Sequence, residues 1–136
     1  MAGNTIANPI DPVAEANNLA NCFYALSQAV DSFRFATRIP PLTDIQAGQL
    51  KDESQGLDNQ AHYFTAQAIG ATLQSIQSDL ANIKTLTAQA AQQVQKLKDV
   101  DKVIKIVTSV LNVGTAIAAG NVTSILSAVN ALSGAI

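Results

Sequence analysis

The chain has 136 residues, a length that suits one domain with a modest core and no need for a disulfide or a structural metal. Charged residues make up 13% of it, about half the share of an average soluble domain, and the net charge is −2. Eight lysines and arginines provide no basic field to neutralise a row of phosphates, so we expect no nucleic-acid partner. The single cysteine, Cys22, excludes an internal disulfide.

The first ten residues are small, polar and interrupted by proline, and we expect residues 1–10 to form a flexible tail. They show neither the basic start nor the apolar stretch of a cleavable signal peptide. The expected location is therefore the cytoplasm or the destination of a signal-independent export route. The composition, poor in charge and rich in Gln, Asn, Ser, Thr and Ala, resembles that of bacterial proteins exported without a cleaved signal, such as flagellar and type III secreted components. This resemblance implies a secreted bacterial protein.

Residues 11–136 are predicted to form a single helical-bundle domain, whose first helix has a well-marked start. Asp11 is a capping residue, and Pro12 suits the first helical position because its missing N–H would have no partner there. Apolar residues then recur at spacings of three and four along one face. The first helix is predicted over about 12–37, because the sequence Ile39-Pro40-Pro41 that follows ends the apolar pattern.

A second, short helix is predicted over about 44–55. Thr43 and Gln46 have the spacing of a capping box, in which each side chain satisfies a backbone donor of the other residue. Gly48 and Gly56 each disfavour helix by about 1 kcal/mol relative to alanine. We therefore expect this helix to be weak and to end before Gly56.

The longest predicted helix covers about 58–98 and carries a regular apolar repeat from Ile69 to Ile104. The repeat alternates spacings of four and three for five heptads, and only Thr87 and Asp101 depart from strong apolar character. This period is typical of a helix that lies along another helix in a shallow supercoil. Because each residue adds about 1.5 Å, this helix would extend beyond the first one, and its apolar face would need a cover from this chain or from another molecule.

The last part of the chain is predicted to be a helical hairpin. Capping-type residues indicate a break near Asp101, after which helices are predicted over about 102–119 and 122–133. Gly120 is placed to end the first of these helices, and Asn121 is placed to cap the second.

Residues 106–136 contain no charged residue. Their apolar stripes could close the bundle core, insert into a membrane under some conditions, or form a permanent anchor; we favour the core, because each helix keeps a polar side of Ser, Thr and Asn. An uncharged hairpin beside a long coiled-coil-like helix resembles the architecture of α-helical pore-forming toxins of the cytolysin A type, over about the last 70 residues. This resemblance implies a hairpin that can enter a membrane.

No pattern in the sequence indicates catalysis, a cofactor or a metal site. His62 is the only histidine and has no second imidazole to work with, so we assign it a structural or surface role. Cys22 lies on an apolar stripe and is predicted to be a buried small side chain. The acidic residues Asp52, Glu53 and Asp58 lack the spacing of a calcium loop and are interpreted as solvated charge. We therefore do not expect an enzyme.

The sequence predicts an all-α protein, an antiparallel helical bundle of four to five helices with one long coiled-coil-like helix and a C-terminal apolar hairpin. The function it favours is non-catalytic interaction or assembly, with another protein or with a second copy of the chain. The alternative is a membrane-active or translocator-like component that inserts the hairpin. The candidate interaction surface consists of apolar residues of the repeat and of the hairpin: Ile69, Leu73, Ile76, Leu80, Ile83, Val94, Leu97, Val107, Leu111, Ile117, Ile125 and Val129.

Overall fold

The computed structural model describes residues 11–67 and 69–136, and within them the ordered elements are helices without any strand. The predicted all-α bundle is therefore confirmed, while the predicted tail, residues 1–10, lies outside the described residues. In chain order the elements are α1 (Pro12–Phe35), α2 (Asp44–Ala66), α3 (Gly70–Ser75), the single 3₁₀ turn η1 (Gln77–Asp79), α4 (Leu80–Lys96), α5 (Val100–Ala119) and α6 (Val122–Ala135).

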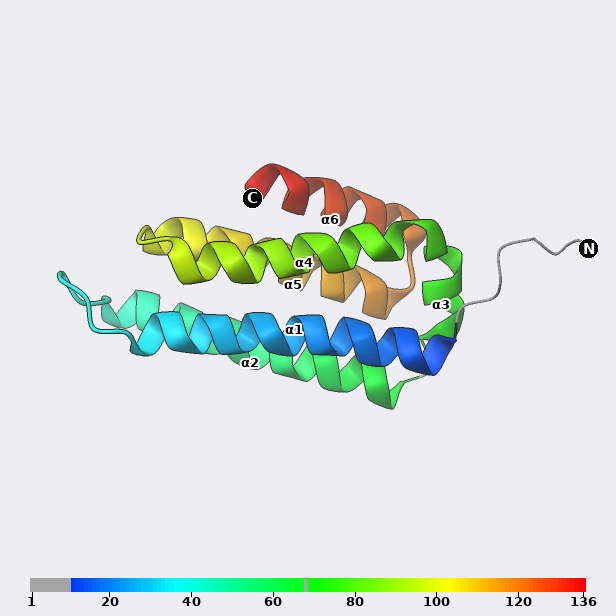
Figure 1. The fold of residues 1–136 in the computed structure, drawn as a ribbon, viewed down its shortest axis with the longest axis horizontal. Coiled ribbons are helices and arrows are strands. Elements are labelled where there is room, and N and C mark those ends of the chain that lie inside the picture. The colour runs from blue at the N-terminus through cyan, green and yellow to red at the C-terminus, as the bar shows by residue number, and fades with distance from the viewer. Residues whose placement is uncertain (1–10, 68) are drawn as a thin grey trace, which may run out of the picture.

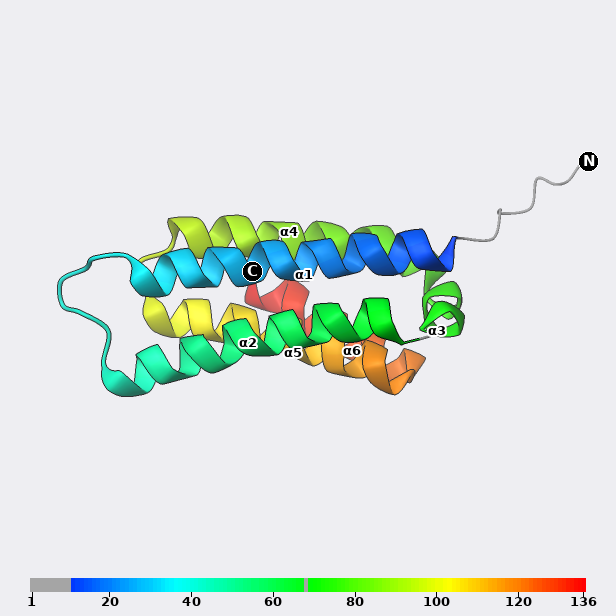
Figure 2. The same ribbon diagram turned by 90° about the horizontal axis from the view of Figure 1, so that it is seen from below.

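The four long helices α1, α2, α4 and α5 form the bundle as two antiparallel hairpins (Figure 1). The α1–α2 hairpin packs on the α4–α5 hairpin, so that α1 lies along α4 and α2 along α5, each pair running in the same direction (Figure 2). Helix α6 folds back on α5 and lies on the side of the second hairpin that faces away from the first. The apolar side chains of both hairpins meet in one core.

The ends of the helices are fixed by the local caps that the sequence predicts. The Asp11 carboxylate accepts backbone N–H groups of the next turn at 3.1 and 3.2 Å. Thr43 and Gln46 form the full capping box, with reciprocal hydrogen bonds of 3.0 and 3.1 Å. Gly120 ends α5 with a left-handed φ of 77°, which favours glycine, and Asn121 caps α6.

The predicted long helix over 58–98 is wrong. The chain leaves helix after Ala66 and turns a corner through α3 and η1 (residues 69–79) before α4 begins at Leu80. The apolar repeat continues through this corner, since the short helical turns keep the spacing that buries Ile69 and Ile76. Turning back places the repeat against α1, which supplies the cover that an unbroken helix would have lacked.

The predicted stop of the second helix before Gly56 is also wrong, because α2 continues to Ala66. Gly56 faces α5, where an added Cβ would lie 3.2 Å from Leu111 Cδ2, so the glycine serves close packing rather than helix termination. The break expected near Asp101 occurs slightly earlier: Asp99 caps α5 by accepting the Asp101 N–H at 3.1 Å.

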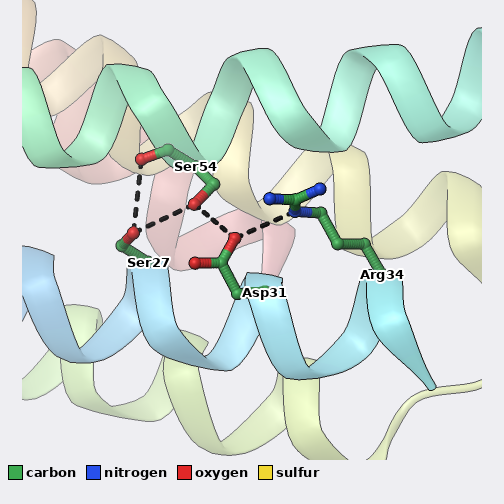
Figure 3. A network of polar contacts seen from close by, with 4 residues as sticks. All are labelled: Ser27, Asp31, Arg34 and Ser54. Carbon is green, nitrogen blue, oxygen red and sulfur yellow. Dashed lines mark hydrogen bonds and ion pairs between the residues drawn. The ribbon is translucent and has the colours of Figure 1, made fainter.

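A polar network links α1 to α2 inside the bundle (Figure 3). The buried Ser27 hydroxyl donates to the Ser54 backbone carbonyl at 3.3 Å and lies 3.0 Å from the Ser54 hydroxyl. Ser54 Oγ donates to Asp31 Oδ1 at 2.7 Å, and Arg34 Nε donates to the same carboxylate oxygen at 2.9 Å. Because buried hydroxyls are costly without partners, this chain of bonds fixes the register of the first hairpin.

Helix α5 lies close to the first hairpin at Gly114, which is buried. A Cβ there would lie 2.0 Å from Gln60 Oε1 and 2.7 Å from Phe23 Cε2. Phe23 cannot withdraw freely, because its ring packs edge-on against Phe64 with centroids 5.1 Å apart in the core.

We therefore expect Gly114→Ala to lower the free energy of unfolding by about 1 to 3 kcal/mol through overpacking. Gly48→Ala is the matched control: Gly48 is an exposed residue of α2 with nothing within 4 Å of an added Cβ. It should raise the free energy of unfolding by about 0.5 to 1 kcal/mol. Urea unfolding followed by circular dichroism measures both, and equal effects of the two substitutions would contradict the close approach.

Candidate interaction surface

The residues predicted to form an interaction surface lie within the folded chain. Leu97 and Leu111 are half-buried, and the other ten are buried: Ile69, Leu73, Ile76, Leu80, Ile83, Val94, Val107, Ile117, Ile125 and Val129. Helix α1 covers α4, while α2 and α6 cover α5. Of the two covers that the sequence left open for this apolar face, this chain or another molecule, the chain itself supplies one. A role of these residues in partner binding stays a prediction, and it requires the bundle to open.

The two positions that interrupt the apolar repeat have different environments. Thr87 is buried, and its hydroxyl donates to the Ile83 carbonyl one turn earlier at 2.8 Å, so its polar atom is satisfied within α4. Asp101 is exposed in the first turn of α5 and takes no part in the core. The repeat is therefore interrupted at Asp101, and Ile104, which follows it in the repeat, is half-buried against the core.

Large apolar side chains are exposed at the end of the bundle where α1 passes to α2. The exposed fractions are 72% for Phe35, 96% for Ile39 and 76% for Ile45. The connecting loop, residues 36–43, extends beyond the ends of α4 and α5 (Figures 1 and 2). We call Phe35, Ile39 and Ile45 the loop-end cluster. Sequence reasoning used Ile39-Pro40-Pro41 only as a helix stop, although an isoleucine beside two prolines was a visible signal of an apolar side chain outside any helix.

A hollow of about 610 Å³ lies behind this loop, between the end of α1 and the turn from α4 to α5. Arg38 lines this hollow and makes two contacts with Phe33. Its guanidinium carbon lies 3.9 Å from the centroid of the Phe33 ring, in a cation–π contact, and its Nη2 donates a hydrogen bond to the Phe33 carbonyl. Arg38 Nε is buried and has no acceptor among the described residues. No sequence pattern predicted this hollow, because its walls come from three separate parts of the chain.

The contact between α2 and α5 contains polar groups that sequence reasoning missed. Glu53, interpreted as solvated, is half-buried and accepts a hydrogen bond from the Thr108 hydroxyl. Burial raises the pKa of Glu53 to about 7, although the Thr108 hydrogen bond acts in the opposite direction. Gln60 Nε2 donates to the Leu111 carbonyl at 3.0 Å. The signal was present, because Glu53 and Gln60 continue the three-four spacing of buried leucines along α2.

His62 and Cys22, the other residues considered for chemistry, contact neighbouring helices or lie half-buried in the bundle. His62 Nδ1 lies 2.9 Å from the Tyr24 hydroxyl and links α2 to α1. Burial raises the pKa of the half-buried Cys22 thiol, an effect that Lys84 only partly opposes, so the thiol stays protonated at neutral pH. Within residues 11–67 and 69–136, no three His, Cys, Asp or Glu side chains lie close enough together to hold a metal ion.

Glu53 makes the stability of the fold dependent on pH. Its pKa rises from 4.5 to about 7 on folding, so the folded chain binds the proton more tightly. The stabilisation of the folded chain by this tighter proton binding at Glu53 is complete below pH 4.5 and is lost as the pH rises through about 7. We expect the melting temperature of Glu53→Gln to fall less over this range than that of the wild type.

The matched control is Asp52→Asn, which removes the same charge from the neighbouring exposed position. Thermal unfolding of the three proteins at a series of pH values measures the difference. If Glu53→Gln keeps the full pH dependence of the wild type, Glu53 ionises freely in the folded chain and the buried contact is not formed.

Comparison of the chain with protein-family models, with curated proteins and with solved structures gives no match. A function for the chain therefore rests on its own surfaces: the loop-end cluster, the hollow behind the loop and the uncharged α5–α6 hairpin.

Proposed function

We propose that this chain is a non-catalytic helical interaction protein that associates through the loop-end cluster. The observation that supports this most is the exposure of Phe35, Ile39 and Ile45 at one end of a bundle whose other large apolar side chains are mostly buried. Removing apolar surface from water is favourable by about 25 cal/mol per Å², so covering such a cluster would stabilise a complex. Contiguous exposed apolar patches are typical of interaction sites, and these three side chains lie at the same end of the bundle.

The partner we propose first is a second copy of the chain. The net charge is only −2, and charged residues are 13% of the sequence, so two copies repel each other weakly. The two prolines that follow Ile39 limit the backbone freedom that the loop would lose on binding. The bundle closes its core within one chain, so association would add a contact at the surface and leave the fold unchanged.

Sedimentation of the wild type and of a Phe35→Ser, Ile39→Ser, Ile45→Ser variant, from low to high micromolar concentration, tests this proposal. We expect the wild type to associate and the triple variant to remain monomeric, since the substitutions remove the apolar contact. The control is Val13→Ser, because Val13 is 70% exposed at the opposite end of α1. A monomeric wild type, or equal loss of association in the control, would contradict self-assembly through the loop end.

A second candidate function is membrane insertion of the α5–α6 hairpin, supported by a specific observation. Of the helices in the described ranges, α5 (Val100–Ala119) is long and apolar enough to cross a membrane, a property that core helices of soluble proteins share. Helix α6 packs mainly on α5 and lies outside the four-helix bundle, so it could separate while α1 and α2 stay paired. Secretion by a bacterium would suit such a role and stays a prediction from composition.

Flotation with vesicles of phosphatidylcholine and phosphatidylglycerol tests the second candidate. Leu126 is 39% exposed on α6, so the fold should tolerate a charge there. The same charge, introduced by Leu126→Glu, would be costly in a lipid interior. We expect the wild type to float with the vesicles and Leu126→Glu to remain in solution, while Val13→Glu behaves as the wild type. Equal flotation of the wild type and Leu126→Glu would argue against insertion of the hairpin.

A further inference from the structure

The hollow behind the loop is lined by apolar side chains together with the polar side chains of Ser32, Thr37, Gln46 and Gln95. Phe33 and Val94 form its buried wall, and Leu97 and Val100 line it from the α4–α5 turn. Ile39 and the two prolines that follow it form the outer side. A volume of about 610 Å³ lies within the range of sites that hold small organic molecules, about 300 to 1,000 Å³.

The charges that line the hollow are all positive. Arg38 and Lys98 are its charged lining residues, and none of the described residues that line it carries a carboxylate. The hydrogen bond to the Phe33 carbonyl uses one donor of the Arg38 guanidinium, which leaves others for an anion. Lys98 is exposed and forms no ion pair within the described part of the chain.

We propose that this hollow binds a fatty acid, with the hydrocarbon chain against the walls and the carboxylate at Arg38 and Lys98. The apolar lining residues would contact the tail, and two cations without a carboxylate favour a single anionic head group. This inference goes beyond the loop-end association: the two sites share Ile39, whereas Phe35 and Ile45 belong to the loop-end cluster and do not line the hollow.

Calorimetric titration of the full chain with monomeric dodecanoate tests the proposal. We expect one dodecanoate per chain, and binding at least tenfold weaker for dodecyltrimethylammonium, which has the same tail and the opposite charge. Equal binding of the two amphiphiles would show adsorption to apolar surface and would overturn the proposal. Binding of many molecules with loss of the helical circular dichroism signal would overturn it as well.

Two lysine variants locate the head group. Lys98→Gln removes a charge that lines the hollow, and Lys96→Gln removes a charge two residues away that is also exposed but does not line it. We expect Lys98→Gln to weaken dodecanoate binding about two- to fivefold, the effect of an exposed ion pair, and Lys96→Gln to leave it unchanged. Equal effects of the two variants would place the ligand elsewhere.

Nuclear magnetic resonance gives a readout that does not depend on either lysine. Methyl signals of Val94, Leu97 and Val100 should shift on addition of dodecanoate, while those of Val122 and Leu126 on α6 stay in place. Shifts confined to α6 would overturn the proposal. A Phe35→Ser, Ile45→Ser variant, which changes no residue that lines the hollow, tests association separately, so failure of one proposal is distinguishable from failure of the other.

Discussion

The structure depends on the corner at residues 69–79, which folds the apolar repeat back along α1. Without this turn the repeat would continue past the end of α1 and expose its apolar face. At the corner, Gly70 lies so close to α1 that an added Cβ would be 2.8 Å from the Pro12 Cβ. Because the corner holds the second hairpin against the first, both hairpins close their apolar faces within one chain.

Features set by neighbouring residues could be predicted from the sequence, whereas features set by contacts between distant segments could not. The capping box at Thr43 and the turn at Gly120 depend on residues a few positions apart, and both are present in the structure. The corner was missed because the apolar spacing continues through it unchanged. The burial of Glu53 was missed for a related reason, since its environment comes from α5, far along the chain. The loop end was missed because a helix stop carries no information about exposure.

The closed core changes where a function can lie. A long apolar seam would have indicated a coiled-coil partner, but α1 and α2 already occupy that position. What remains for other molecules is peripheral: the loop-end cluster, the hollow beneath the loop and the outer side of α6. All three can be altered by single substitutions of exposed residues, so binding can be changed while the core is left intact.

The parallel pairing of α1 with α4 and of α2 with α5 also determines which helix ends meet at the loop end. It brings two helix C-termini and two helix N-termini together there, with opposite partial charges from the helix dipoles. Arg34 and Lys96 lie in the last turns of α1 and α4, and Asp44 and Asp101 lie in the first turns of α2 and α5, so each carries the sign that its helix end favours. The cations of the hollow, Arg38 and Lys98, lie in the connections that follow the C-termini of α1 and α4. Both therefore follow a helix end whose partial charge is negative.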